Sequence, residues 1–128
     1  MAEFRIQKKT LLSFDEAVAR VPPALQAQGF GVLTQIDVKE TLKQKIGVDF
    51  RRYRIFGACN PKLAHRALST ELEIGVMLPC NVVVYEGDDG KAVVLAIDPM
   101  ATIASTQPGL AGIAGEVRAG LAKALEAV

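Results

Sequence analysis

Hydrophobic and polar residues follow two different periods along this chain. Alternation of apolar and polar side chains, and short apolar runs bounded by turn residues, are typical of β-strands. These patterns predict five strands, over residues 2–12, 31–37, 52–59, 81–86 and 91–98. Gly87-Asp-Asp-Gly90 joins the last two strands and is a strong hairpin signal.

Apolar residues at helical spacing lie between these strands. Ser13 and Glu16 form a capping box ahead of the first helical segment, and Gly29 ends it. Pro22 and Pro23 are expected to kink or split this helix, because neither residue can donate a backbone hydrogen bond to the preceding turn. Asp37 and Asn60 are typical N-cap residues for two of the later helices. The later helices are predicted over residues 38–46, 61–72 and 109–127.

The order of these elements favours an α+β fold over a parallel, doubly wound sheet, because the hairpin pairs two strands without a helix between them. We expect a single domain over residues 1–128, with an antiparallel sheet of about five strands and helices packed on one face. Half of the 128 residues are apolar, which excludes a disordered chain. No apolar run approaches the roughly 18 residues of a membrane span, so we expect no membrane partner.

The formal net charge of +1 excludes bulk electrostatic binding of the histone kind. The segment 50–56, Phe-Arg-Arg-Tyr-Arg-Ile-Phe, mixes arginines with aromatic residues, as nucleic-acid-binding sheets do. Strand alternation, however, places Arg51 and Tyr53 on the opposite face from Arg52 and Arg54. We therefore interpret this segment as a solvated edge and expect no nucleic-acid partner.

The first residues contain no apolar core of a secretory signal, so a cytoplasmic location is expected. In that compartment the two cysteines are expected to be thiols. The high apolar content also suggests burial between subunits, and thus a homodimer. Four glycines weaken the last predicted helix, and close packing of its backbone on the sheet or on a second subunit is the expected compensation; they are Gly109, Gly112, Gly115 and Gly120.

Cys59 ends one predicted strand and Cys80 begins the next, so both thiols are expected at the same end of the sheet, on one buried face. Three interpretations stay open at this stage. The thiols are inert core residues, or a functional pair in a pocket wall, or metal ligands. Cys59 precedes a helix N-terminus, which favours a thiolate. His65 is the single histidine and would complete a three-ligand site for Zn or Cu(I), although no paired short spacing such as CxxC is present.

The stretch Tyr53–Pro61, the stretch Gly75–Tyr85 and the pair Asp98-Pro99 resemble the domain of unknown function 302 family, and Gly31–Gly47 resembles its N-terminal half. The resemblance implies a compact α+β domain likened to half a TATA-box-binding protein, often a homodimer, with no assigned reaction. It also points to a site at one end of the sheet. The matching signature positions are Cys59, Asn60, Pro61, Leu78, Pro79, Cys80, Asn81, Asp98 and Pro99.

The leading hypothesis is a dimeric, cytoplasmic binding or stress-accessory module with no cofactor that the sequence identifies. It would hold a small anionic or apolar ligand between the sheet and the last helix. Cys59 and Cys80 would line the rim, Asn60 and Asn81 would offer amide hydrogen bonds, and Asp98 would accept one. One alternative is a thiol-dependent redox or sulfur-transfer enzyme, with Cys59 as nucleophile and Cys80 as resolving thiol. The other is soft-metal binding by Cys59, Cys80 and His65.

Overall fold

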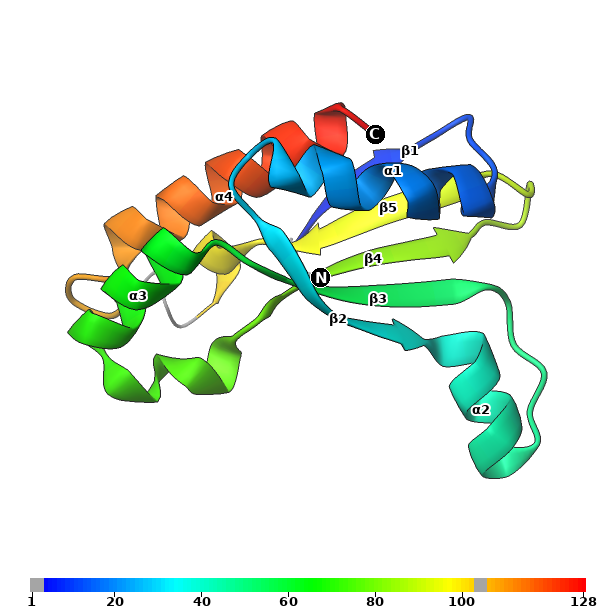
Figure 1. Cartoon of the computed structure of the whole chain (residues 1–128), viewed down its shortest axis with the longest axis horizontal. Coiled ribbons are helices and arrows are strands. Elements are labelled where there is room, and N and C mark those ends of the chain that lie inside the picture. Colours follow the sequence, from blue (N-terminus) through cyan, green and yellow to red (C-terminus); the bar gives the residue numbers. More distant parts are fainter. Residues whose placement is uncertain (1–3, 103–105) are drawn as a thin grey trace.

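The computed structural model describes residues 4–102 and 106–128. Its centre is one five-stranded antiparallel sheet in the order β1-β5-β4-β3-β2 (Figure 1). This arrangement confirms the predicted single-domain α+β fold. The five strands are β1 (Arg5–Lys9), β2 (Gly31–Asp37), β3 (Tyr53–Cys59), β4 (Cys80–Glu86) and β5 (Ala92–Ile97).

Among the described residues, four α-helices and two short 3₁₀ helices connect and cover the strands. Two of the α-helices, α1 and α4, lie side by side over one face of the sheet (Figure 1). No helix of the described residues is long and apolar enough to cross a membrane. The α-helices are α1 (Phe14–Gln26), α2 (Val38–Ile46), α3 (Pro61–Thr70) and α4 (Ala111–Glu126), and the 3₁₀ helices are η1 (Leu72–Met77) and η2 (Pro99–Ala101).

The core lies between the sheet and the two helices that cover it. In β3, β4 and β5 the alternate side chains that face these helices are buried, because successive side chains of a strand point to opposite faces. Burial of this apolar surface is the main favourable term in folding. The largest fully buried side chains are Val21, Leu25, Phe56, Val82, Val84, Val94, Leu110 and Leu121.

The first helix passes through both of its prolines without a break, so the predicted split does not occur. Val21 and Leu25 flank the prolines and are each only 1% exposed. An interior proline costs a helix about 3 kcal/mol, and fully burying side chains such as these returns roughly 1.5–3 kcal/mol each. The predicted end at Gly29 is confirmed: its φ is +83°, and the next amide, of Phe30, donates to the Leu25 carbonyl.

Residues 31–50, which comprise β2, α2 and the segment after it, are here called the arm. The arm begins at the core, against which Val32 packs, and α2 lies at its far end, away from the core (Figure 1). Helix α2 has no buried residue, so its stability is local. The Asp37 carboxylate accepts a hydrogen bond from the Glu40 amide, and Gly47 ends the helix in the left-handed region. The large apolar side chains that the arm exposes are Leu33, Ile36, Ile46, Val48 and Phe50.

The sheet face opposite α1 and α4 is here called the open face. By register it carries the strand residues of the other parity, and most of the large apolar ones are half-buried rather than fully buried. Tyr53 of β3 and Tyr85 of β4 stack on this face, with ring centroids 5.8 Å apart. The other apolar residues of the open face include Ile55, Val83, Leu95 and Ile97.

Candidate functional site

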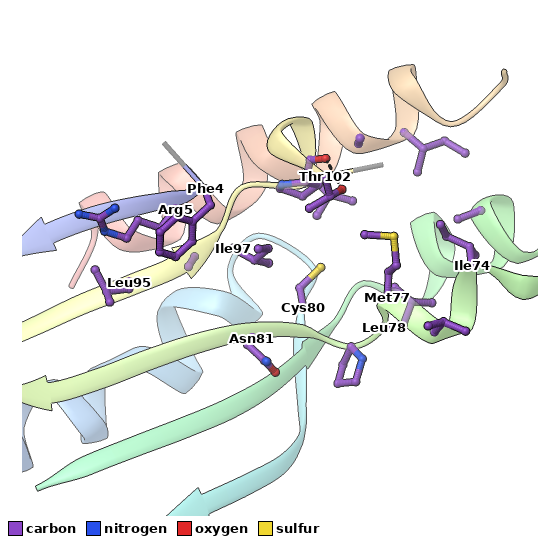
Figure 2. A pocket seen from close by; sticks show the side chains of 18 of the residues that line it. Phe4, Arg5, Ile74, Met77, Leu78, Cys80, Asn81, Leu95, Ile97 and Thr102 are labelled. Atoms are coloured by element: carbon purple, nitrogen blue, oxygen red, sulfur yellow. Dashed lines mark hydrogen bonds between the residues drawn. The ribbon is translucent and has the colours of Figure 1, made fainter. Parts of the chain in front are cut away.

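A cavity of about 580 Å³ lies at the end of the sheet where β4 begins and β5 ends (Figure 2). Its volume falls within the range of roughly 300–1,000 Å³ that is typical of small-molecule sites. It runs from the space between α3, η1 and α4 to the open face of the sheet. Most of its lining is apolar, which is also typical of ligand sites.

The inner end of the cavity has rigid walls of buried side chains. A separate hydrophobic cluster forms these walls. It consists of Ala67 of α3, Ile74 of η1, Leu110 just before α4, and Ile113 of α4. An ion pair between Arg66 and Glu116, 2.9 Å long, links α3 to α4 on the protein surface. The buried cluster packs on the chain's own side chains without a ligand, so the inner end is preformed.

The outer end of the cavity is more polar and opens over β1, β4 and β5. Arg5, Tyr53 and Asn81 line it together with Val83 and Leu95. Figure 2 shows Phe4 and Arg5 on the opposite side of the cavity from Met77 and Ile74. Arg5 is the one charged residue among the described residues that line the cavity. The site therefore has an apolar inner end and a more polar outer end.

The two cysteines do not share a face of the sheet, and the prediction that they do is wrong. The register pairs Cys80 with Ala58 rather than with Cys59. Because adjacent residues of a strand point to opposite faces, Cys59 lies on the other face from Ala58 and Cys80. Both thiols are free and half-buried. Only Cys80 lines the cavity.

Burial, together with a smaller effect of the Cys59 thiol, raises the pKa of the Cys80 thiol to about 11. Burial has this effect because it disfavours the charged thiolate. At neutral pH Cys80 is therefore a protonated, weakly polar part of the cavity wall. A thiol in this state is a poor nucleophile, since the thiolate is the reactive form.

Asn60 and Asp98, which were predicted at the site, do not line this cavity. The Asn60 side chain is the N-cap of α3 and accepts a hydrogen bond from the Leu63 amide at 3.2 Å. One Asp98 carboxylate oxygen caps η2 through the Met100 amide, and the other pairs with Arg118 Nε of α4 at 3.0 Å. Asn81, by contrast, lines the outer end next to Cys80. The structure thus places two of the five predicted residues, Cys80 and Asn81, in one cavity.

The predicted metal site is absent from the part of the chain that the structure describes. No three His, Cys, Asp or Glu side chains there lie close enough together to hold a metal ion. His65 is exposed on α3, and the two cysteines lie on opposite faces of the sheet. The proposed ligand set of Cys59, Cys80 and His65 is therefore not assembled.

Comparison with known proteins agrees with the fold and with the sequence signature. A family model described as "Domain of unknown function DUF302" matches residues 6–128. The chain belongs to this family. The crystal structure of an uncharacterized conserved DUF302 protein from Bacillus stearothermophilus matches with a TM-score of 0.89 and 33% sequence identity, covering 98% of each chain. No curated protein matches the chain.

Several residues of the cavity in this DUF302 domain did not emerge from the sequence. The predicted helix over 61–72 ends at Thr70, and the segment after it forms η1. The apolar run from Ile74 to Leu78 was a usable signal, because such a run beside a helix has to be buried against something. Arg5 gave no signal, since strand alternation alone does not show which charged residue lies beside a cavity.

Proposed function

We propose that this DUF302 domain binds a small, mainly apolar ligand in the cavity beside Cys80. The observation that supports the proposal is the cavity itself, which combines buried apolar walls with a few polar groups at its mouth. The bound ligand would replace water against these walls, and this transfer of apolar surface is favourable. The proposed location is the cytoplasm, as expected from the sequence.

The role proposed for Cys80 is that of a wall residue rather than a nucleophile. Its raised pKa keeps the thiol protonated at neutral pH. Asn81, one residue further along β4, is exposed at the mouth and offers an amide to a polar group of the ligand. This proposal keeps two of the predicted ligand contacts, those with Cys80 and Asn81. It leaves out the predicted contact with Cys59, which does not line the cavity.

A fluorescent probe tests the proposal directly. N-phenyl-1-naphthylamine is small, neutral and apolar, and its emission rises when it leaves water. We expect saturable binding to the wild-type protein, and loss of binding in Ala114→Met, because Ala114 lines the cavity and is 4% exposed. Ala119→Met is the matched control, because Ala119 lies on the exposed side of the same helix.

A second blocking variant guards against misfolding of the first. Asn81→Trp places a large ring at the mouth from an exposed strand position, so the core is left intact. Probe binding that survives both blocking variants would overturn the proposal. Native mass spectrometry of freshly purified protein adds an independent measurement, since a retained ligand gives excess mass that disappears on denaturation.

We also propose that the domain acts as a homodimer in which the arm of each copy packs against the other copy. The arm exposes five large apolar side chains, and Ile46 is 66% exposed. The open face of the same chain is apolar at its centre and is not covered by α1 or α4. In a two-fold dimer the arm of each copy would cover the open face of the other copy, because both copies use the same surfaces.

Sedimentation velocity measurements test the homodimer. We expect a dimer for the wild-type protein and a monomer for Ile46→Asp, because a charge on the arm would be buried at the interface. Leu11→Asp is the control, since Leu11 is 87% exposed and lies outside the arm. A monomeric wild-type protein, or a dimer that tolerates Ile46→Asp, would contradict this proposal.

A further inference from the structure

We infer that the chain has a second binding site, and that this site takes the phosphate group of a small phosphomonoester. The site is an open cleft of about 520 Å³, formed where α3 packs against α4 (Figure 1) and extended by Gln28 of the turn after α1. Its described lining residues are all different from those of the cavity beside Cys80. This inference therefore goes beyond the proposed function and does not depend on it.

The charges that line this cleft are not balanced. Among the described lining residues one is acidic, Glu116, and the cationic ones are Lys62, Arg66 and Lys123. Glu116 is already paired with Arg66, at 2.9 Å. Within the described part of the chain, no acidic group pairs with Lys62 or Lys123. Two positive charges therefore remain in the cleft, and a ligand with two negative charges would match them.

A phosphate ester fits this charge better than a carboxylate does. A phosphomonoester carries about −1.5 to −2 charges at pH 7. A carboxylate carries one negative charge and would leave one of the two lysines without a partner. Lysine is a common phosphate ligand, which it binds as a point charge. The charge of the cleft thus favours a phosphate group over the other common biological anions.

The neutral polar side chains of the cleft add hydrogen-bond donors. Asn60 Oδ1 accepts a hydrogen bond from the Leu63 amide at 3.2 Å, so Nδ2 is the end of this side chain that stays available. The Gln28 side chain is half-buried and has no hydrogen-bond partner among the described residues. A phosphate group has three strong acceptor oxygens. Asn60 would therefore serve as a ligand residue as well as the cap of α3.

The rest of the cleft surface is apolar and favours an ester over free phosphate. Leu63, Ala119 and Gly120 belong to this part of the lining. An organic group attached to the phosphate would cover these residues and remove apolar surface from water, which is favourable. Inorganic phosphate would leave the same surface exposed.

Two matched probes test the charge of the ligand. Phenyl phosphate and benzenesulfonate each join a tetrahedral oxyanion to a benzene ring, but the sulfonate carries a single charge. In isothermal titration calorimetry we expect phenyl phosphate to bind about tenfold more tightly than benzenesulfonate, because only the phosphate matches both lysines. It should also bind more tightly than inorganic phosphate. Nuclear magnetic resonance should show shifts of the Gln28, Leu63 and Ala119 amides on binding.

Substitutions of exposed residues locate the site. Lys62→Gln and Lys123→Gln should each weaken phenyl phosphate binding about tenfold, through loss of one charge-assisted hydrogen bond. Lys43→Gln is the matched control, because Lys43 is also an exposed helical lysine and does not line the cleft. It should leave the affinity unchanged.

Glu116→Gln should act in the opposite direction. The substitution removes the negative charge of the cleft and releases Arg66 from its ion pair. We expect phenyl phosphate to bind about threefold more tightly to this variant, because a third cation then faces the ligand. A disturbed structure would weaken binding instead, so a gain in affinity identifies an electrostatic role.

A blocking variant separates this site from the cavity of the proposed function. Ala119 is exposed and lines the cleft, so Ala119→Met should abolish phenyl phosphate binding and retain naphthylamine binding. Absence of phenyl phosphate binding to the wild-type protein overturns this inference, as does equal binding of benzenesulfonate or binding that survives both lysine substitutions. Absence of naphthylamine binding alone overturns the proposed function and leaves this site standing.

Discussion

Phe30 lies directly against Gly120, so that a methyl group at Gly120 would stand 2.7 Å from Cε1 of the Phe30 ring. Phe30 is 2% exposed and belongs to the main core, so its ring has little room to move. Close packing therefore accounts for one of the glycines that weaken α4. It does not account for Gly112 or Gly115, which face open space.

Replacing Gly120 by alanine should destabilise the protein. The helix gains about 1 kcal/mol in propensity from such a change, but overpacking a core costs typically 1–3 kcal/mol. The difference between these two terms is a net loss of up to about 2 kcal/mol in the free energy of unfolding. Urea denaturation followed by circular dichroism measures this loss.

Replacing Gly112 or Gly115 by alanine should have the opposite effect. Each lies in the same helix, and a Cβ atom at either position meets no other atom within 4 Å. The helix then gains up to about 1 kcal/mol per substitution without a clash. A loss of stability in either variant would show that these positions contact something beyond the single chain, such as a second copy.

Stability above pH 9 should depend on Cys80. Its pKa in the folded protein is about 11, whereas an unfolded thiol titrates near 8.5. Between these values the unfolded state loses its proton and the folded state keeps it, so stability falls as the pH rises. Cys80→Ala should therefore show a shallower loss of unfolding free energy between pH 8.5 and 10.5 than the wild-type protein. Identical slopes would contradict the raised pKa.

The two thiols should fail to form a disulfide with each other in the folded protein. The register sets Cys59 and Cys80 on opposite faces of the sheet, and side chains that point apart cannot be bridged without backbone movement. Treatment with diamide followed by mass spectrometry should show no loss of two hydrogens from the monomer. Formation of a reversible Cys59–Cys80 disulfide would instead revive the redox hypothesis.

The ion pair between Asp98 and Arg118 should contribute measurably to stability. The Asp98 side chain is 13% exposed, so its interaction is poorly screened by water. A double-mutant cycle with Asp98→Asn and Arg118→Gln should give a coupling of about 0.5–1 kcal/mol. Arg51 and Asp88 form a pair at the same distance of 3.0 Å with Asp88 94% exposed, and that pair should give a coupling near zero. Equal coupling energies for the two ion pairs would contradict the prediction that burial of the carboxylate strengthens the pair.

Local signals predicted the elements of this fold well. The capping residues Ser13, Asp37 and Asn60 each begin the helix that they were expected to begin. Such caps depend on neighbouring backbone groups only, so they can be identified without the tertiary structure. The prolines at 22 and 23 show the limit of this approach, because long-range packing maintained a helix that local rules would divide.

The candidate site was predicted less completely than the fold, because strand register is a tertiary property. A shift of one residue moves a side chain to the other face of a sheet. Cys59 was placed on the same face as Cys80 by the spacing of the strands, whereas the observed pairing of Ala58 with Cys80 separates them. Asn81 was predicted at the site because the family signature, rather than the pattern of hydrophobic residues, identified it.

The pairing of β1 with β5 has a consequence for folding during synthesis. Ile6 pairs with Ala96, and Lys8 pairs with Val94, so the two paired strands are separated by most of the described chain. In the final sheet β1 is an edge strand whose one neighbour is β5. The ribosome therefore releases β1 long before its partner, and the early chain carries a strand that nothing yet pairs. Closure of the sheet waits for the last third of the sequence, so a truncated nascent chain would expose its N-terminal strand to chaperones.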